Sequence, residues 1–186
     1  MEENQVKGLL YILVSPGKAP EFLAVYELSN PANVEPSHLE AEQVSSFNKV
    51  EMRIYGLSSE RTSPKYESAS DNRIFRTLAL QPGPQLSEKD YNEWYEEEHV
   101  PLLSVVPGWL KSTRWTLREA RAWNQGEMQS SELSKYLAIH EWESMESFSF
   151  PEFKHATSTP WRDQILPKLD RAMDERRNFK PQKRIF

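Results

Sequence analysis

Two histidines are the side chains in this 186-residue chain best suited to move protons. His99 follows a helical run of aromatic residues, and His140 lies in an alternating run typical of a β-strand. Imidazole titrates near neutral pH, so each could take a proton from a carbon acid or a phenol and return it at another atom. We therefore predict that His99 and His140 are catalytic. The alternative is that both are structural, with His99 capping its helix and His140 bonded to a backbone carbonyl.

Six further side chains near the two histidines are candidates for substrate binding. Tyrosine hydroxyls could donate to an enolate oxygen, indole rings could stack on a planar substrate, and a guanidinium could pair with a carboxylate. The helical aromatic residues also have the spacing of an amphipathic core face, so a purely structural role stays open. The candidates are Tyr91, Trp94, Tyr95, Arg114, Tyr136 and Trp142.

No residue pattern in the chain marks a metal or a cofactor. The sequence has no cysteine, no HxH or HExxH spacing, and no glycine-rich dinucleotide or phosphate loop. Haem ligation by a single histidine would leave no local pattern. We therefore expect chemistry with no metal and no cofactor.

The elements that must position these residues follow the order β-α-β-β-α-β. Ser87 and Asp90 resemble a capping box that begins a helix, and Glu98 on that helix is expected to face solvent. Proline lacks the N–H that a further helical turn needs, so the helix should end before Pro101. The predicted elements are strands at 75–83, 109–118, 136–142 and 177–186, a helix from 88 to 100, and an interrupted helical stretch at 148–169.

The strand 136–142 presents two different faces. A period of two places Tyr136, His140 and Trp142 on one face, and Leu137 with Ile139 on the other. We expect the apolar Leu137 and Ile139 to pack against the helices. His140 and the aromatic residues would then line a cavity on the opposite side of the sheet.

Three short segments recur in the same order in two parts of the chain. The first segment and its match lie 66 residues apart, and the second segment and its match lie 114 residues apart. These separations differ by 48, so the first copy lacks about 48 residues between its first two strands. We therefore predict a shortened first repeat at 1–66 and a complete repeat at 67–186. The matched pairs are 9–17 with 75–83, 21–27 with 135–141, and 51–55 with 175–179.

The predicted order is that of a ferredoxin-like unit, an α+β fold with both helices on one face of an antiparallel sheet. Two such sheets can pack face to face into a barrel, formed by two repeats or by two chains. Because the first repeat is incomplete, we expect a homodimer to cover the exposed sheet.

Charge and hydropathy exclude several partners. The net charge is −5, and glutamates cluster beside the helical aromatic residues, so a nucleic-acid partner is not expected. No apolar run is long enough to cross a bilayer, and the first residues do not resemble a secretory signal. With no cysteine as well, we expect a soluble cytoplasmic protein.

The motif Asp90-Tyr-x-x-Trp-Tyr-x-x-x-His99-x-Pro101 resembles the EthD-like branch of the dimeric α+β barrel superfamily, of fungal type. A later Pro-Gly-Trp109, the strand 136–142 and the segment Thr159-Pro-Trp-Arg162 add to this resemblance. It covers residues 72–186 and, as a shortened repeat, residues 7–65. In this family the missing helix of the first repeat would carry a second copy of the histidine motif.

The resemblance implies a fold shared by cofactor-free oxygenases, cyclases and decarboxylases, so the function does not follow from the fold alone. Our first hypothesis is a cofactor-independent lyase of secondary metabolism, a decarboxylase or cyclase acting on an aromatic or β-keto polyketide-type ligand by acid–base catalysis. One alternative is an O₂-dependent, cofactor-free oxidoreductase. The other is a non-catalytic ligand-binding protein with a degenerate repeat.

Overall fold

The computed structural model describes residues 8–15, 22–28, 49–66, 73–125, 127–129 and 133–180. The predicted strand ends at Pro16 to Glu21 and at 181–186 lie outside these ranges. By its contacts the chain divides into two compact units. Unit 1 comprises residues 1–58 and 115–133, and unit 2 comprises 59–114 and 134–186. This division differs from the predicted repeats 1–66 and 67–186, which concern sequence similarity and stay a prediction.

Unit 1 is built from strands in its described part. The strands are β1 (Gly8–Ser15), β2 (Phe22–Leu28), β3 (Lys49–Thr62), β5 (Trp109–Asn124) and β6 (Glu127–Gln129). Their order is β2-β1-β3-β5, and β6 pairs with β5. The three strands expected in the shortened repeat are therefore present as β1, β2 and β3, with β1 antiparallel to both of its neighbours.

Strand β5 is longer than predicted and ends at Asn124 rather than near residue 118. The added residues, 119–124, include the charged Glu119 and Arg121. Arg121 pairs with Glu119 at 3.0 Å, and Ala122 is buried in this part of the strand. A tight turn at Gln125, whose φ is 52°, then leads into β6.

Unit 2 contains an antiparallel sheet in the order β5-β7-β4-β8. Its strands β4 (Ile74–Leu80) and β7 (Tyr136–Trp142) lie close to the predicted ranges, whereas β8 (Glu175–Phe179) begins two residues earlier than predicted. In the register, Arg76 of β4 lies opposite His140 of β7 and opposite Asn178 of β8. These three residues therefore share one face of the sheet.

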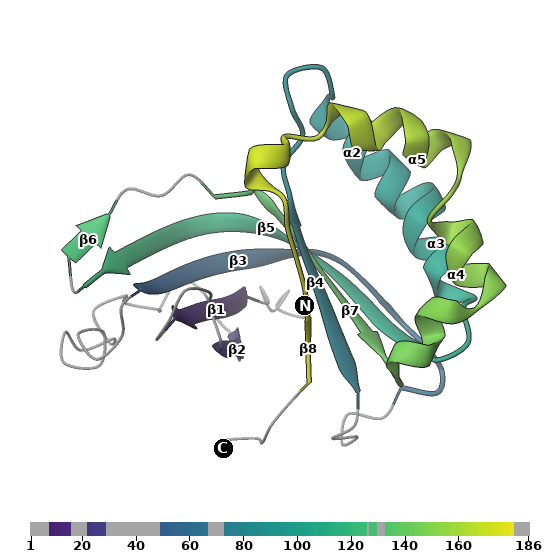
Figure 1. The fold of residues 1–186 in the computed structure, drawn as a ribbon, viewed down its shortest axis with the longest axis horizontal. Coiled ribbons are helices and arrows are strands. Elements are labelled where there is room, and N and C mark those ends of the chain that lie inside the picture. Colours follow the sequence, from purple (N-terminus) through teal and green to yellow (C-terminus); the bar gives the residue numbers. More distant parts are fainter. Residues whose placement is uncertain are drawn as a thin grey trace, which may run out of the picture. The chain divides into compact units, whose positions relative to one another are not determined.

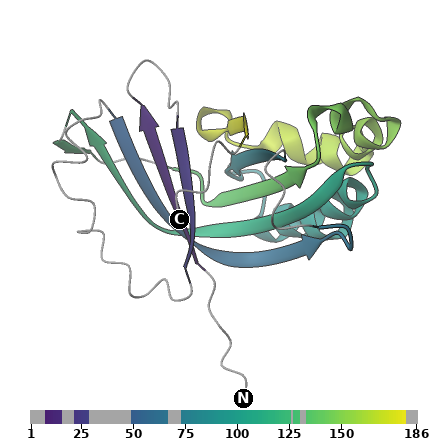
Figure 2. The same cartoon turned by 90° about the horizontal axis from the view of Figure 1, so that it is seen from below.

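Two helical segments of unit 2 lie together on that face (Figures 1 and 2). The first begins at Ser87, whose Oγ accepts a hydrogen bond from the Asp90 N–H at 3.0 Å, as the capping box predicts. It comprises α2 (Glu88–Glu93), the π-helix η3 (Trp94–His99) and α3 (Val100–Ser104). The second comprises η4 (Met145–Ser149), α4 (Pro151–Ala156), α5 (Pro160–Ile165), η5 (Leu166–Lys168) and η6 (Arg171–Met173).

The helix does not end before Pro101, so that prediction is wrong. Pro101 lies in the first turn of α3, directly after the π-helix, and the helix continues to Ser104. In the π-helix the Val100 N–H donates to the Tyr95 carbonyl, five residues back. The wider turn relieves the clash between a proline ring and the carbonyl four residues before it, and a missing N–H is tolerated in a first turn.

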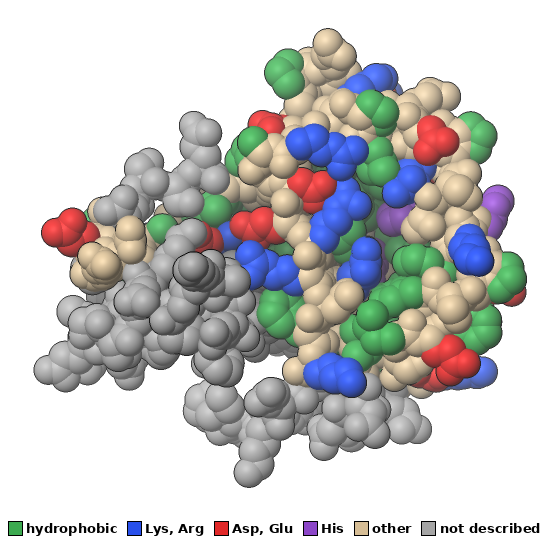
Figure 3. Space-filling view, viewed as in Figure 1, with side chains coloured by type: hydrophobic (Ala, Val, Ile, Leu, Met, Phe, Trp, Pro, Cys, Tyr) green, Lys and Arg blue, Asp and Glu red, His purple; other side chains and the backbone are tan. Residues whose placement is uncertain are grey.

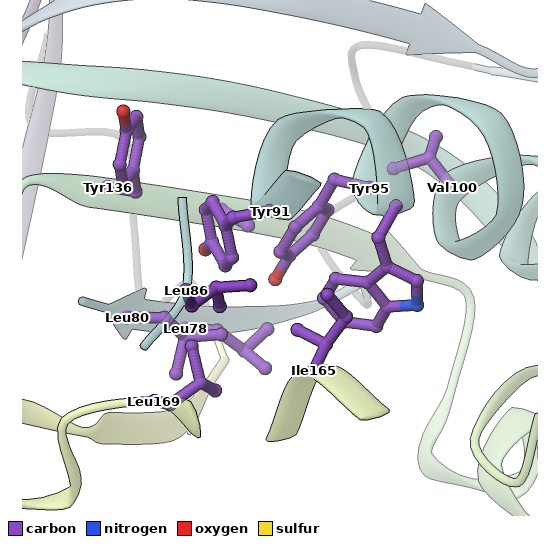
Figure 4. Close-up of a cluster of buried hydrophobic side chains, with 11 residues drawn as sticks. Leu78, Leu80, Leu86, Tyr91, Tyr95, Val100, Tyr136, Ile165 and Leu169 are labelled. Atoms are coloured by element: carbon purple, nitrogen blue, oxygen red, sulfur yellow. The ribbon is translucent and has the colours of Figure 1, made fainter. Parts of the chain in front are cut away.

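The prediction for the two faces of β7 is also wrong, because the faces are exchanged. Tyr136 and Ala138 belong to the main core, where they pack with Tyr91 and Trp94 of the helices (Figure 4). Trp142 belongs to a second cluster with residues of α3 and α4. The large aromatic side chains, which can fill the space between two layers, therefore face the helices, and His140 faces them too.

Unit 2 thus has the β-α-β-β-α-β order and the single helical layer of a ferredoxin-like unit. The α+β fold class predicted from the sequence is confirmed.

Candidate functional site

A cavity lies between the sheet and the helices of unit 2, and His99 and His140 both contribute to its wall. It is partly open to solvent. Leucine, tryptophan and phenylalanine side chains form about half of its wall, and polar side chains form the rest, a mixed lining found in small-molecule sites. The polar side chains of the wall are Arg76, Tyr95, His99, His140, Thr157, Arg162 and Arg176.

His99 is the last residue of the π-helix η3, and its orientation follows from that geometry. Its ring stacks on Trp94, with centroids 4.7 Å apart and planes 21° apart, and meets Tyr95 edge to face at 5.3 Å. In an α-helix, residues five apart point about 140° away from one another. The wider π-helical turn therefore brings Trp94 and His99 onto one side.

Trp94 is itself held in place by Glu98. The Trp94 Nε1–H donates to Glu98 Oε1 at 3.2 Å, and the Thr159 hydroxyl donates to the same oxygen at 2.5 Å. Thr159 also caps helix α5, because its Oγ1 accepts from the Arg162 N–H. Glu98 is thus a half-buried link between the two helical segments, and the expectation that it faces solvent is wrong.

The hydrogen bond of His99 defines its tautomer. Nδ1 lies 3.3 Å from the Ala156 carbonyl oxygen, which can only accept, so Nδ1 carries the hydrogen. The pKa of His99 is lowered to about 4, mainly by burial and also by nearby arginines, while the bond to Ala156 acts in the opposite sense. The ring is therefore neutral at neutral pH, with a lone pair on Nε2 that no described residue occupies.

His140 has the opposite tautomer. The Trp109 Nε1–H donates to Ser112 Oγ at 2.9 Å, and Ser112 Oγ lies 2.7 Å from His140 Nδ1. Among the described residues, His140 Nδ1 is the acceptor available to the buried Ser112 hydroxyl. Ser112 therefore donates to Nδ1, and His140 carries its hydrogen on Nε2.

His140 is also neutral. Burial lowers its pKa well below the ordinary value, and the neighbouring His99 and Arg76 act in the same direction. Its Nε2 is fully buried and has no hydrogen-bond partner among the described residues. An N–H donor without a partner therefore lies in the wall of the cavity.

The two rings have their centroids 6.2 Å apart and are nearly perpendicular, at 82°. Both can therefore contact one small molecule. His99 offers a basic lone pair and His140 offers an N–H donor, which is the combination needed to remove a proton and stabilise the negative charge that results.

The candidate residues divide between the cavity and the core. Trp94, Tyr95 and Trp142 line the cavity together with both histidines. Tyr91 and Tyr136 do not, because they pack against each other in the core with centroids 5.1 Å apart.

Arg114 does not line the cavity either. Its Nη1 donates to Glu96 at 2.7 Å and its Nη2 donates to Asn92 at 2.6 Å. The guanidinium also lies 4.3 Å from the centre of the Tyr95 ring. Arg114 therefore supports Tyr95 from outside the cavity.

Four site residues were not predicted from the sequence: Arg76, Ser112, Arg162 and Arg176. Arg76 interrupts an apolar strand, which marks it as unusual, but only the register shows that it lies opposite His140. Arg162 belongs to the Thr159-Pro-Trp-Arg segment noted above. Ser112 and Arg176 have no local signal, because their roles depend on partners far away in the sequence.

Two general properties follow from the described part of the chain. No three His, Cys, Asp or Glu side chains gather there as ligands for a metal ion. None of its helices has the length and apolar character needed to cross a lipid bilayer.

Neither a protein-family model nor a curated protein matches the chain. Solved structures share its fold. An anthrone oxidase-like protein superposes with a TM-score of 0.58 at 10% identity, covering 95% of this chain and 90% of the other. A protein from Fusobacterium nucleatum, named provisionally as a monooxygenase, gives a TM-score of 0.52 at 12% identity over 95% of this chain and 75% of its own. At these low identities the likeness shows a shared fold.

Proposed function

We propose that the cavity of unit 2 is the active site of a cofactor-independent enzyme that oxidises a small carbon acid with O₂. The observation that carries this proposal is the pair of neutral histidines with opposite tautomers. His99 can act as a base and His140 as a donor in the same cavity. The names of the two similar structures, an oxidase-like protein and a monooxygenase, favour oxidation over the lyase reaction.

The reaction begins when His99 Nε2 removes a proton from an acidic C–H that is conjugated with a carbonyl group. The electron pair moves onto the carbonyl oxygen, where the His140 Nε2–H stabilises the enolate. Aromatic walls formed by Trp94 and Trp142 suit a planar, conjugated substrate, whose carbanion is readily oxidised.

The enolate carbon then donates electrons to O₂, and a C–O bond forms. The peroxide takes up the proton that His99 holds, and loss of water leaves a new carbonyl. In the net reaction, one CH₂ group and one O₂ molecule give one C=O group and one water molecule. The protein thus supplies acid–base catalysis, and the substrate supplies the electrons.

A second candidate is the lyase reaction predicted from the sequence. Loss of CO₂ from a β-keto acid produces the same enolate, so His140 would have the same role and the carbon would take up a proton instead of reacting with O₂. The cationic wall formed by Arg76 and Arg176 is compatible with an acid substrate. Oxygen uptake distinguishes oxidation from decarboxylation, which releases CO₂ without consuming O₂.

The test uses anthrone, a carbon acid that O₂ converts to anthraquinone and water. We expect oxygen uptake above the uncatalysed rate. The His99→Asn variant keeps an N–H for the Ala156 carbonyl and lacks the base, so kcat should fall about 10²–10⁴-fold. His140→Asn keeps an acceptor for Ser112 and lacks the Nε2–H, and should lose about 10²–10³-fold.

His155→Asn is the matched control, because His155 is exposed on helix α4 and should leave the rate unchanged. Folding of each variant is checked by circular dichroism. Full activity in both folded site variants would disprove the proposed roles. Binding of anthrone without any oxygen uptake would favour the non-catalytic alternative.

A further inference from the structure

Among the described residues, the charged side chains that line the cavity are all cationic. Arg76, Arg162 and Arg176 contribute to its wall, and no aspartate or glutamate of the described ranges does. In the view of Figure 3, Lys and Arg side chains gather over strand β8, at the edge of this sheet. The protein as a whole carries a net charge of −5, so this positive lining is a local feature.

The three arginines differ in how far their charge is neutralised. Arg176 is paired with Asp174, which accepts from its Nε and Nη2 at 2.8 Å each. Arg162 lies 3.8 Å from the exposed Asp163. For Arg76, no carboxylate in the described ranges forms an ion pair.

The contacts of Arg76 leave most of its donors unused. One Nη1–H donates to Asn178 Oδ1 at 3.3 Å, and the guanidinium lies 5.2 Å from the centre of the Phe148 ring. Burial and the nearby Arg176 both lower its pKa. A half-buried guanidinium without an anion is costly, and a bound anion would offset that cost.

A second donor without a partner lies in the same wall. The Trp142 side chain is fully buried, and its Nε1 has no hydrogen-bond partner among the described residues. Trp142 lies two residues after His140 on β7, and Arg76 lies opposite His140, so the three share one face of the sheet. The site thus combines N–H donors and positive charge without an anionic acceptor.

We infer that this cavity binds an aromatic carboxylic acid, whose carboxylate is held by Arg76 and the Trp142 Nε1–H. A guanidinium matches the two oxygens of a carboxylate, and the indole N–H adds a further donor. The aromatic body of the ligand lies among Trp94, Trp142 and Phe153. His140 remains available for the enolate oxygen.

This assignment rests on the proposed function and narrows its substrate to a carbon acid that also carries a carboxylate. Arginine stabilises the carboxylate more than the neutral CO₂ that decarboxylation would release. The acid group bound by Arg76 is therefore retained in the product, and the oxidised carbon lies elsewhere in the molecule.

The test is isothermal titration calorimetry at neutral pH with benzoate and with benzamide, its uncharged analogue. Benzoate should bind at least about tenfold more tightly than benzamide, because only the carboxylate can form charge-assisted hydrogen bonds. Arg76→Met should reduce benzoate affinity to that of benzamide, and Trp142→Phe should weaken it by a smaller factor. Arg76→Lys keeps the positive charge but cannot bind both carboxylate oxygens through a planar guanidinium, so its benzoate affinity should lie between those of Arg76→Met and the unmodified protein.

Arg177→Met is the matched control. Arg177 is the neighbour of Arg176 on β8 and lies opposite Thr77, on the other face of the sheet, so its loss should not change benzoate affinity. Equal affinities for benzoate and benzamide, no binding of either, or unchanged binding in folded Arg76→Met would each overturn the inference. His99→Asn separates this test from the proposed reaction, because it should lose turnover and still bind benzoate.

Discussion

The depressed pKa of His99 makes folding stability depend on pH in a specific window. In the unfolded chain the imidazole has an ordinary pKa near 6.5, whereas burial lowers it to about 4 in the folded protein. Between these values the unfolded chain binds more protons, so acid favours unfolding. The stability associated with neutral His99 is complete above about pH 6.5 and lost as the pH falls to about 4.

The size of this effect follows from the two pKa values. The gap between about 6.5 and about 4 corresponds to about 3 kcal/mol of unfolding free energy. His140 acts in the same direction, because burial lowers its pKa as well. Carboxylates titrate in the same window, so the contribution of His99 must be measured as a difference between two proteins.

The assay is urea unfolding of the unmodified protein and of His99→Asn, from neutral pH down to about pH 4. Asparagine can still donate to Ala156 and does not titrate, so the variant should lose about 3 kcal/mol less over this range. The NMR chemical shift of the His99 ring protons, followed against pH, should also show a midpoint well below pH 6.5. The reasoning fails if both proteins lose stability in parallel, or if His99 titrates near its ordinary value.

Three other predictions concern single features. Ser112→Ala leaves Trp109 Nε1 and His140 Nδ1 buried without their hydrogen-bond partner, so urea unfolding should show a loss of about 2–4 kcal/mol. Ser112→Thr should recover much of this loss. Equal stabilities of Ser112→Ala and the unmodified protein would contradict the hydrogen-bond chain. Arg73→Met removes a buried ion-pair partner of Glu141, and urea unfolding should show a loss of about 3–5 kcal/mol. Replacing Arg73 by Met and Glu141 by Leu together should cost less, and a larger loss in this double variant would argue against the pairing. Analytical ultracentrifugation should show the homodimer expected from the shortened first repeat, and a folded monomer at micromolar concentration would rule it out.

The sequence predicted the element types well because most of them have local signals. The capping pair Ser87 and Asp90, the Pro-Gly stop after β4 and the alternation in β7 each act within a few residues. The region around Pro101 was predicted incorrectly, because proline also fits the first turn of a new helix after a π-helix. A local rule cannot separate these two cases.

The site was predicted only in part, for a different reason. Both histidines and the aromatic residues could be recognised by type, since few side chains transfer protons near neutral pH. The face of β7 that carries His140 and Trp142 does line a cavity, but the prediction placed the helices on the opposite face, because a period of two separates two faces without saying which one the helices cover. Arg76 and Ser112 depend on strand register, which joins residues far apart in the chain.

The π-helix makes the spacing between Trp94 and His99 as important as the residues themselves. The two rings stack across five positions, and four residues lie between them, three of which are glutamates. An exchange of one exposed glutamate, such as Glu97, would leave the path of the backbone intact. Removal of one residue would restore the narrower turn and rotate the base away from its indole neighbour. In evolutionary terms, this short stretch should tolerate changes of side chain far better than changes of length.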